Sequence, residues 1–328
     1  MNRSKKNWNL LADIGGTNAR FAIEDFDKRI VEKIYSYSVL QYESFESVID
    51  AFIHDVAALR FWNSYPKAAC FSVACVVDDP IIRFTNNSWQ FTKSQISKKL
   101  GDIFVDVIND FESIARAIPY LCSGDCYELG VSTGKNRHQN FAIIGPGTGL
   151  GVSGLFLNKG QYNVISGEGG HVDFAPVNDQ EFKIFKYLHD KYGRVSLERI
   201  LSGEGIVNIY SALSGNRKNA VGIMDEVAIG KAAESGEDDF CLEVINIFFS
   251  ILGSAAGNLA LTLGARGGVY LAGGIVPRYI TLLEKSSFRS RFEDKGRYKT
   301  YMQEIPTRVV MRPDTGIMGA SNRLSVST

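Results

Sequence analysis

Apolar runs and helical patterns alternate along this chain. Short apolar runs, typical of buried strands, occur at 10–12, 20–23, 30–37, 68–77, 103–108 and 268–272. The apolar residues of 45–59 recur at helical spacing instead, and similar patterns predict helices over 111–121, 180–192, 196–213 and 237–263. Ser196 is the expected N-cap of the helix over 196–213. Strands that alternate with helices in this way indicate an α/β protein.

Two apolar runs are each interrupted by a turn rich in glycine and threonine. The first turn contains Gly15, Gly16, Thr17 and Asn18, and the second contains Gly147, Thr148 and Gly149. Glycine lets the backbone come close to a ligand, so that successive N–H groups and a threonine hydroxyl can converge on phosphate oxygens. Two such turns suggest that related halves of the chain hold one nucleotide, which favours an ATP-dependent enzyme.

Acidic residues follow two of the predicted strands. Asp13 lies where the first strand meets its glycine turn. This place suits a water-mediated Mg²⁺ ligand, because Mg²⁺ keeps most of its waters and takes few carboxylates; a turn aspartate that caps its own backbone is the alternative. Asn109 and Asp110 follow another strand and begin a helix. Asp110 would orient an attacking hydroxyl and accept its proton, as an aspartate does in kinases, or the pair would act only as a helix N-cap.

A glycine-rich segment at 166–176 carries Glu168 and His171. A carboxylate and an imidazole provide complementary hydrogen bonds for a polyhydroxylated ligand. A metal site made by the same two residues is disfavoured, because they lie on a glycine loop and no third ligand is evident. Glu198, near the start of the helix predicted from Ser196, has the simpler explanation that carboxylates favour helix N-termini.

The composition limits the classes of partner. The chain has 328 residues, of which 45% are hydrophobic, so it is long enough for two domains with substantial cores. Its 36 basic and 36 acidic residues balance, which predicts binding neither to nucleic acid nor to an anionic membrane. The apolar stretch at 245–263 contains several polar residues and is expected to be a buried helix rather than a membrane span. An odd number of cysteines and an N-terminus without a secretory pattern predict a cytoplasmic protein.

The chain resembles the bacterial-type glucokinase family over nearly its whole length. The matching runs, in chain order, are LADIGGTNARFAI, FTNNSWQF, INDFESIARAIP, IGPGTGLGV, SGEGGHVDFAP, SLERILSGEGIVNIY, GNLALTLGARGGVYLAGGIVPR, FEDKGR and GIMGAS. The resemblance implies the two-lobed actin-like ATPase (ribonuclease H-like) fold with an interlobe cleft. Residues 1–120 plus 313–328 would form a small α/β domain and residues 121–312 a large one. The resemblance also implies a homodimer.

The same resemblance implies that the γ-phosphoryl group of ATP is transferred, with Mg²⁺, to the 6-hydroxyl of D-glucose, the first step of glycolysis. Asp110 would be the catalytic base, and the sugar would be bound by Asn109, Asp110, Glu168, His171 and Glu198. The two glycine turns and Asp13 would bind the phosphates, with Gly273 and Gly274 near the nucleotide. The alternatives are a kinase for another hexose or aminosugar and a non-catalytic sugar-sensing protein.

The chain departs from the family at Val76. Many relatives carry a proline after the cysteine that corresponds to Cys75, where this chain has valine. We expect this difference to alter a loop near the sugar, with consequences for affinity and hexose selectivity. The cysteine-rich zinc motif of the related repressor and sugar-kinase group is absent from the sequence, so no zinc is expected.

Overall fold

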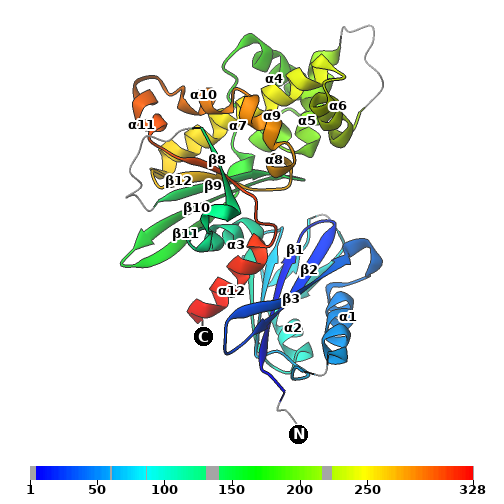
Figure 1. Cartoon of the computed structure of the whole chain (residues 1–328). Helices are drawn as coiled ribbons and strands as arrows, with labels where there is room; N and C mark the ends of the chain where they lie inside the picture. Colours follow the sequence, from blue (N-terminus) through cyan, green and yellow to red (C-terminus); the bar gives the residue numbers. More distant parts are fainter. Residues whose placement is uncertain (1–4, 60, 86, 131–139, 216–223, 328) are drawn as a thin grey trace. The chain divides into compact units, whose positions relative to one another are not determined.

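The chain forms two compact units in the computed structural model (Figure 1). The first unit consists of Met1–Leu121 and Pro313–Thr328, and the second of Cys122–Arg312. The structure describes residues 5–59, 61–85, 87–130, 140–215 and 224–327. The first unit is thus built from two parts of the sequence that lie far apart, because the C-terminal helix returns to it.

The first unit is built on a five-stranded sheet with the strand order β3-β2-β1-β4-β7. Its strands are β1 (Trp8–Ile14), β2 (Asn18–Asp25), β3 (Ile30–Ser38), β4 (Ala68–Val73) and β7 (Phe104–Asn109). The first three form an antiparallel meander, and β4 and β7 continue the sheet parallel to β1. A separate hairpin consists of β5 (Ile81–Arg83) and β6 (Gln90–Thr92).

Helices cover both faces of this sheet. On one face, α1 (Phe45–Ala58) and α2 (Lys93–Lys99) pack into an aromatic core that includes Phe21, Phe45 and Phe52. On the other face, the helix α12 (Thr315–Ser327) packs Ile317, Ala320 and Leu324 against the strands, next to α3 (Asp110–Ala117). A sheet covered on both faces explains why the residues of β1 and β4 are almost all buried rather than alternately buried and exposed.

Charged side chains also attach α12 to the sheet. Asp106 on β7 accepts hydrogen bonds from Arg323 of α12 at 2.7 Å and from Lys93 of α2 at 2.8 Å. Burial alone would raise the pKa of Asp106, but the hydrogen bonds and charges of Lys93 and Arg323 outweigh burial and hold that pKa below its ordinary value. The ion pairs therefore stabilise the unit while the carboxylate is ionised, and this contribution is lost as the pH falls through the lowered pKa.

The second unit is built on a six-stranded sheet with the strand order β11-β10-β9-β12-β13-β8. Its strands are β8 (Cys126–Leu129), β9 (Phe141–Pro146), β10 (Leu150–Asn158), β11 (Gln161–Gly167), β12 (Gly268–Leu271) and β13 (Thr307–Val310). As in the first unit, an antiparallel meander of three strands is continued by two parallel strands. The shared order confirms the prediction of two related halves.

The helices of the second unit surround one long central helix, α7 (Asp239–Leu263). The others are α4 (Asp179–Tyr192), α5 (Gly203–Ser214), α6 (Glu226–Ser235), α8 (Ile275–Arg278), α9 (Ile280–Lys285), α10 (Phe288–Glu293) and α11 (Lys299–Gln303). Within the described residues, α7 alone is long and apolar enough to cross a membrane, and 67% of its most apolar window is buried in the protein. The prediction of a buried helix over 245–263 is thereby confirmed.

Short 3-10 turns connect these elements and account for one wrong prediction. They are η1 (Val39–Gln41), η2 (Ile118–Tyr120), η3 (Ser123–Asp125), η4 (Gly169–His171), η5 (Leu197–Arg199) and η6 (Gly296–Tyr298). No helix begins at Ser196: only η5 follows it, and Ser196 makes no side-chain cap bond there. The helix begins at Gly203, where the Ser202 hydroxyl accepts a hydrogen bond from the Gly205 N–H.

Candidate functional site

Polar residues of the first unit gather where three parallel strands end. Asp13 on β1 is paired in register with Ser72 on β4, and the next residue of β4, Val73, is paired with Asn109 at the end of β7. The carboxyl ends of parallel strands are where α/β sheets bind ligands. The structure therefore brings Asp13, Asn109 and the following Asp110 to the same edge of one sheet.

Asp13 is partly buried at this edge. The Ser72 hydroxyl donates a hydrogen bond to Asp13 Oδ1 at 3.3 Å. Burial raises the pKa of Asp13, and the Arg20 charge and the Ser72 hydrogen bond oppose that rise. A carboxylate that is partly dehydrated in this way gains from a nearby cation, and one carboxylate with waters suffices for Mg²⁺. The described residues contain no group of three or more His, Cys, Asp or Glu side chains that could hold a metal by themselves.

The turn after Asp13 connects β1 to β2. The Gly15 N–H donates to the Asn18 carbonyl at 3.0 Å, and the Val39 N–H donates to the Thr17 carbonyl at 2.9 Å. These bonds fix a tight loop whose Thr17 and Asn18 side chains are exposed. The predicted residues of this turn, Gly15 and Gly16 included, thus adjoin the Asp13 carboxylate.

Asn109 and Asp110 have separate places at the start of α3. Asn109 is the N-cap, and its Oδ1 accepts hydrogen bonds from the N–H groups of Phe111 at 2.8 Å and Glu112 at 3.3 Å. Asp110 is the first helical residue. Asn109 is therefore the N-cap that the sequence left open for this pair, and Asp110 Oδ1 also accepts a hydrogen bond from the Phe111 N–H, at 2.9 Å.

The loop that carries Val76 borders this pair. The Asn109 side-chain amide donates to the Cys75 carbonyl at 3.3 Å. Burial and the nearby Asp110 charge raise the pKa of the Cys75 thiol to about 11. Val76 itself is exposed. A change in this loop can therefore reach Asn109 through one hydrogen bond.

In the second unit, two glycine segments lie next to each other. The turn between β9 and β10 is closed by a 2.8 Å hydrogen bond from the Gly147 N–H to the Gly149 carbonyl, and Thr148 is exposed at its tip. Gly273 has a φ of +80°, and a Cβ there would overlap the Pro146 carbonyl, so this backbone contact requires glycine. The backbone of Gly274 lies against Gly147. The predicted phosphate turn and the Gly273–Gly274 segment are thus brought together.

Glu168 and His171 lie on one loop that is pinned to the sheet. Glu168 precedes the turn η4, which ends at His171, and both residues are exposed. A Cβ on Gly170 would overlap the Leu150 carbonyl, so the loop rests directly on the first residue of β10. A backbone hydrogen bond also holds the end of the loop: the Leu197 N–H donates to the Val172 carbonyl at 2.9 Å. The two predicted sugar-binding residues therefore have a fixed backbone.

Glu198 connects this loop to the glycine turn. It lies in η5, and its Oε2 accepts a hydrogen bond from the Leu150 N–H at 2.9 Å. The same oxygen would be 2.5 Å from a Cβ on Gly149. The sequence explanation of Glu198 as a helix-start carboxylate is wrong, because the carboxylate binds a strand that lies 48 residues earlier in the chain.

The predicted residues thus form one group in each unit. Asp13, the turn 15–18, Asn109 and Asp110 belong to the first unit, whereas the turn 147–149, Glu168, His171, Glu198 and Gly273–Gly274 belong to the second. Sequence reasoning missed Ser72, whose only signal is a hydroxyl inside an otherwise apolar run.

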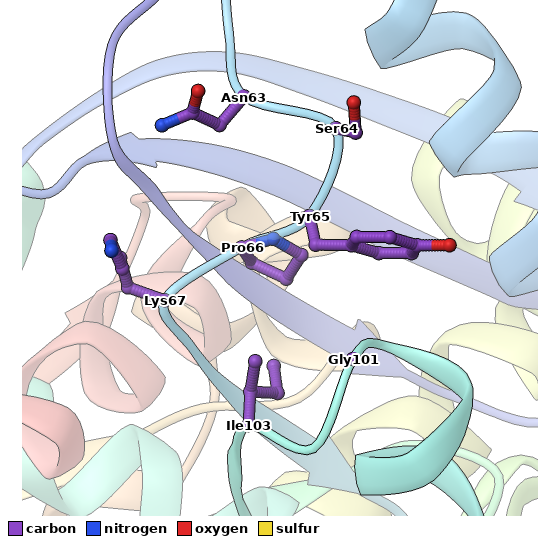
Figure 2. Close-up of a pocket in the computed structure, with 7 residues that line it drawn as sticks. All are labelled: Asn63, Ser64, Tyr65, Pro66, Lys67, Gly101 and Ile103. Atoms are coloured by element: carbon purple, nitrogen blue, oxygen red, sulfur yellow. The ribbon is translucent and has the colours of Figure 1, made fainter.

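A pocket of about 370 Å³ in the first unit does not coincide with either group. Figure 2 shows the residues that line it: Asn63, Ser64, Tyr65, Pro66, Lys67, Gly101 and Ile103. These residues precede the first residues of β4 and β7, at the opposite sheet edge from Asp13 and Asn109. None of the predicted site residues lines this pocket, so it is not the candidate site.

Comparisons with known proteins bear on both groups of residues. A family model described as Glucokinase matches residues 10–326. The chain is 38% identical over 318 residues to the glucokinase of Photorhabdus laumondii, covering 97% of each chain. It is 39% identical over 323 residues to that of Campylobacter jejuni subsp. doylei, covering 98% of this chain and 95% of that one. The crystal structure of a glucokinase from an Antarctic psychrotroph has a TM-score of 0.83 at 33% identity and covers 98% of this chain and 99% of that one.

Proposed function

The chain belongs to the glucokinase family, and we propose how its residues share the work of phosphorylating glucose. It has the two-lobed actin-like ATPase fold and is an ATP-dependent sugar kinase. The reaction converts ATP and D-glucose to ADP and D-glucose 6-phosphate. The assignment of individual residues to its steps is our proposal.

Asp110 is the proposed catalytic base. It would orient the 6-hydroxyl of glucose and accept its proton as the γ-phosphoryl group is transferred. The observation that carries this proposal is the position of Asp110 at the start of α3. Asn109 makes the cap bonds, and the carboxylate of Asp110 stands one residue further on, at the edge where the parallel strands end.

The sugar is proposed to bind Glu168, His171 and Glu198 of the second unit and Asn109 and Asp110 of the first. Glu168 and His171 are exposed on a loop with a fixed backbone, so they can present a carboxylate and an imidazole to sugar hydroxyls. Asn109 uses Oδ1 for the helix cap and its amide for the Cys75 carbonyl, and the amide carries a second N–H. Polar groups paired with hydroxyls in this way discriminate strongly between sugars.

The phosphates of ATP are proposed to bind the turn 15–18, the turn 147–149 and the segment Gly273–Gly274. In each segment the backbone is tightly turned or packed against other backbone, so that its N–H groups can face an anion. Asp13 would hold Mg²⁺ through water, which agrees with its partly buried carboxylate at the turn. When bound, Mg²⁺ neutralises negative charge on the phosphates.

We propose a homodimer, on the resemblance to the family alone. We also propose that the enzyme works in the cytoplasm, because its five cysteines are free thiols, as is typical of a reducing compartment.

The sugar selectivity can be tested directly. We expect ADP release from Mg-ATP with D-glucose, and slower release with fructose, mannose and N-acetylglucosamine, because the same hydroxyl-binding residues would leave polar groups unpaired with the wrong sugar. Initial rates over a range of each sugar give kcat/KM for the four acceptors. A higher kcat/KM for another acceptor would identify a kinase for that sugar instead. Glucose binding without any turnover would contradict the kinase function itself.

Replacing Glu168 by glutamine should weaken glucose binding. The carboxylate accepts hydrogen bonds from hydroxyls more strongly than an amide does, so the expected loss is about 1–3 kcal/mol, or about 5- to 150-fold in affinity. Isothermal titration with glucose measures it. The matched control is Glu234→Gln, on an exposed position of α6 in the same unit. Equal glucose affinity in the two variants would contradict the proposed contact.

A further inference from the structure

We infer that Gly316, in the C-terminal helix, is a positioning residue for the carboxylate of Asp13. The inference rests on the proposed role of Asp13 as the residue that holds Mg²⁺ through water. Gly316 is the second residue of α12, which lies some 300 positions after Asp13 in the sequence but in the same unit. Nothing in the local sequence pattern connects the two residues.

The backbone of Gly316 packs directly against the carboxylate of Asp13. A Cβ on Gly316 would be 2.5 Å from Asp13 Cγ, 2.6 Å from Oδ1 and 2.8 Å from Oδ2. These three atoms of Asp13 are the nearest neighbours of that position, and real Cβ atoms do not approach so closely. The space beside the Asp13 carboxylate is therefore available only because residue 316 has no side chain.

The backbone conformation gives no other reason for glycine here. Gly316 is helical and is not among the glycines with positive φ. Alanine fits helical backbone and is favoured over glycine in helices. The cost of an alanine at 316 would thus come from the collision with Asp13 and not from backbone strain.

The helix cannot move away to relieve this collision. The Ser113 hydroxyl on α3 donates to the Gly316 carbonyl at 2.7 Å, and this bond is buried. One turn later, Gly319 rests on the Ser113 carbonyl so closely that it also has no room for a Cβ. Arg323 is bound to Asp106 at 2.7 Å. Three successive turns of α12 are therefore fixed to the rest of the unit.

The carboxylate is the part that can move. The hydrogen bond that Asp13 Oδ1 accepts from the Ser72 hydroxyl is long, at 3.3 Å. A Cβ at 316 would therefore rotate the carboxylate away from its present position, and the water-mediated Mg²⁺ contact would be lost or lengthened. Substitution of a group that orients a metal ligand typically lowers metal affinity or activity about 10- to 100-fold.

We expect Gly316→Ala to weaken Mg²⁺-dependent ADP binding at least about tenfold. Isothermal titration of ADP at a series of Mg²⁺ concentrations measures this without turnover. The matched control is Ser321→Ala, further along α12, which loses a hydrogen bond to the buried Glu24 and not a contact with Asp13. The control should lower the midpoint of thermal unfolding but leave the Mg²⁺ dependence unchanged.

A double-mutant cycle isolates the contact. In the Asp13→Ala background the carboxylate is gone, so adding Gly316→Ala should cost no further stability and no further Mg²⁺ affinity. If Gly316→Ala alone fails to fold, recovery of folding in the double variant supports the inference equally.

Two results would overturn it, and they can be told apart. If Asp13→Ala weakens Mg²⁺-dependent binding but Gly316→Ala behaves like Ser321→Ala, the positioning role is wrong and the Asp13 role stands. If Asp13→Ala leaves the Mg²⁺ dependence unchanged, the proposed Asp13 role is wrong and the inference falls with it.

Discussion

The variant Asp110→Asn should lose most turnover while it keeps glucose binding. An amide has nearly the shape of the carboxylate and can still bond a sugar hydroxyl, but it cannot accept the proton that the 6-hydroxyl must release. General-base catalysis by a positioned carboxylate contributes about 100- to 10,000-fold, so kcat should fall by that factor. Glucose affinity should change by less than about tenfold, since the loss is specific to the transition state.

ADP release at saturating substrates and glucose titration by calorimetry measure the two effects separately. The matched control is Glu112→Gln on the same helix, whose carboxylate bonds Arg116 at 2.7 Å and has no proposed contact with substrate. It should retain nearly full kcat. Near-normal turnover in Asp110→Asn would contradict the proposed role of Asp110 as the base. Equal losses of turnover and glucose affinity would make Asp110 a binding residue only.

The sequence was most informative where polar residues end apolar strands. Asp13 and Asn109 could each be placed at the end of a strand because each follows an apolar run. The structure adds that β1 and β7 are both parallel to β4, which brings the two residues to one sheet edge. The placement at a strand end needs only the local pattern, and the rule that strand ends carry ligands makes both residues candidates. The two glycine turns follow from the same kind of pattern, which is repeated in both sheets.

Partners of these residues could not be predicted, because they come from distant parts of the chain. Ser72 and Gly316 reach Asp13 from β4 and α12, and no spacing near Asp13 indicates either. The strand β11 was also missed. It is an edge strand whose residues are mostly exposed, so it lacks the apolar run by which buried strands are recognised.

The wrong helix start at Ser196 has a specific physical cause. The apolar pair Ile200 and Leu201 continues the helical pattern across 196–213, but both side chains are buried in the core by a 3-10 turn and the residues that follow it. The Ser202 hydroxyl donates to the Glu198 carbonyl at 2.8 Å and caps the true helix. The Glu198 carboxylate, in this short turn, accepts a hydrogen bond from the Leu150 N–H. The prediction of a helix from Ser196 did not include this contact.

That contact predicts different outcomes for two substitutions of Glu198. Glu198→Gln keeps an oxygen that can accept from the Leu150 N–H, so it should raise the KM for glucose alone. Glu198→Ala leaves the N–H of the buried Leu150 without its acceptor, which costs about 1–3 kcal/mol and loosens the turn 147–149. The alanine variant should therefore raise the KM for both glucose and ATP, each by about 5- to 150-fold.

Initial rates over a matrix of glucose and ATP concentrations give both constants, and Glu204→Ala serves as the control. Glu204 is an acid close by, at the start of α5, and its carboxylate bonds the Tyr192 hydroxyl at 2.8 Å on the surface. It should leave both constants near wild type. If Glu198→Ala and Glu198→Gln change the KM for ATP equally, the effect comes from charge and not from the turn. If neither changes the KM for ATP, Glu198 acts on the sugar side alone, and the glycine turn is held by its own backbone bond between Gly147 and Gly149.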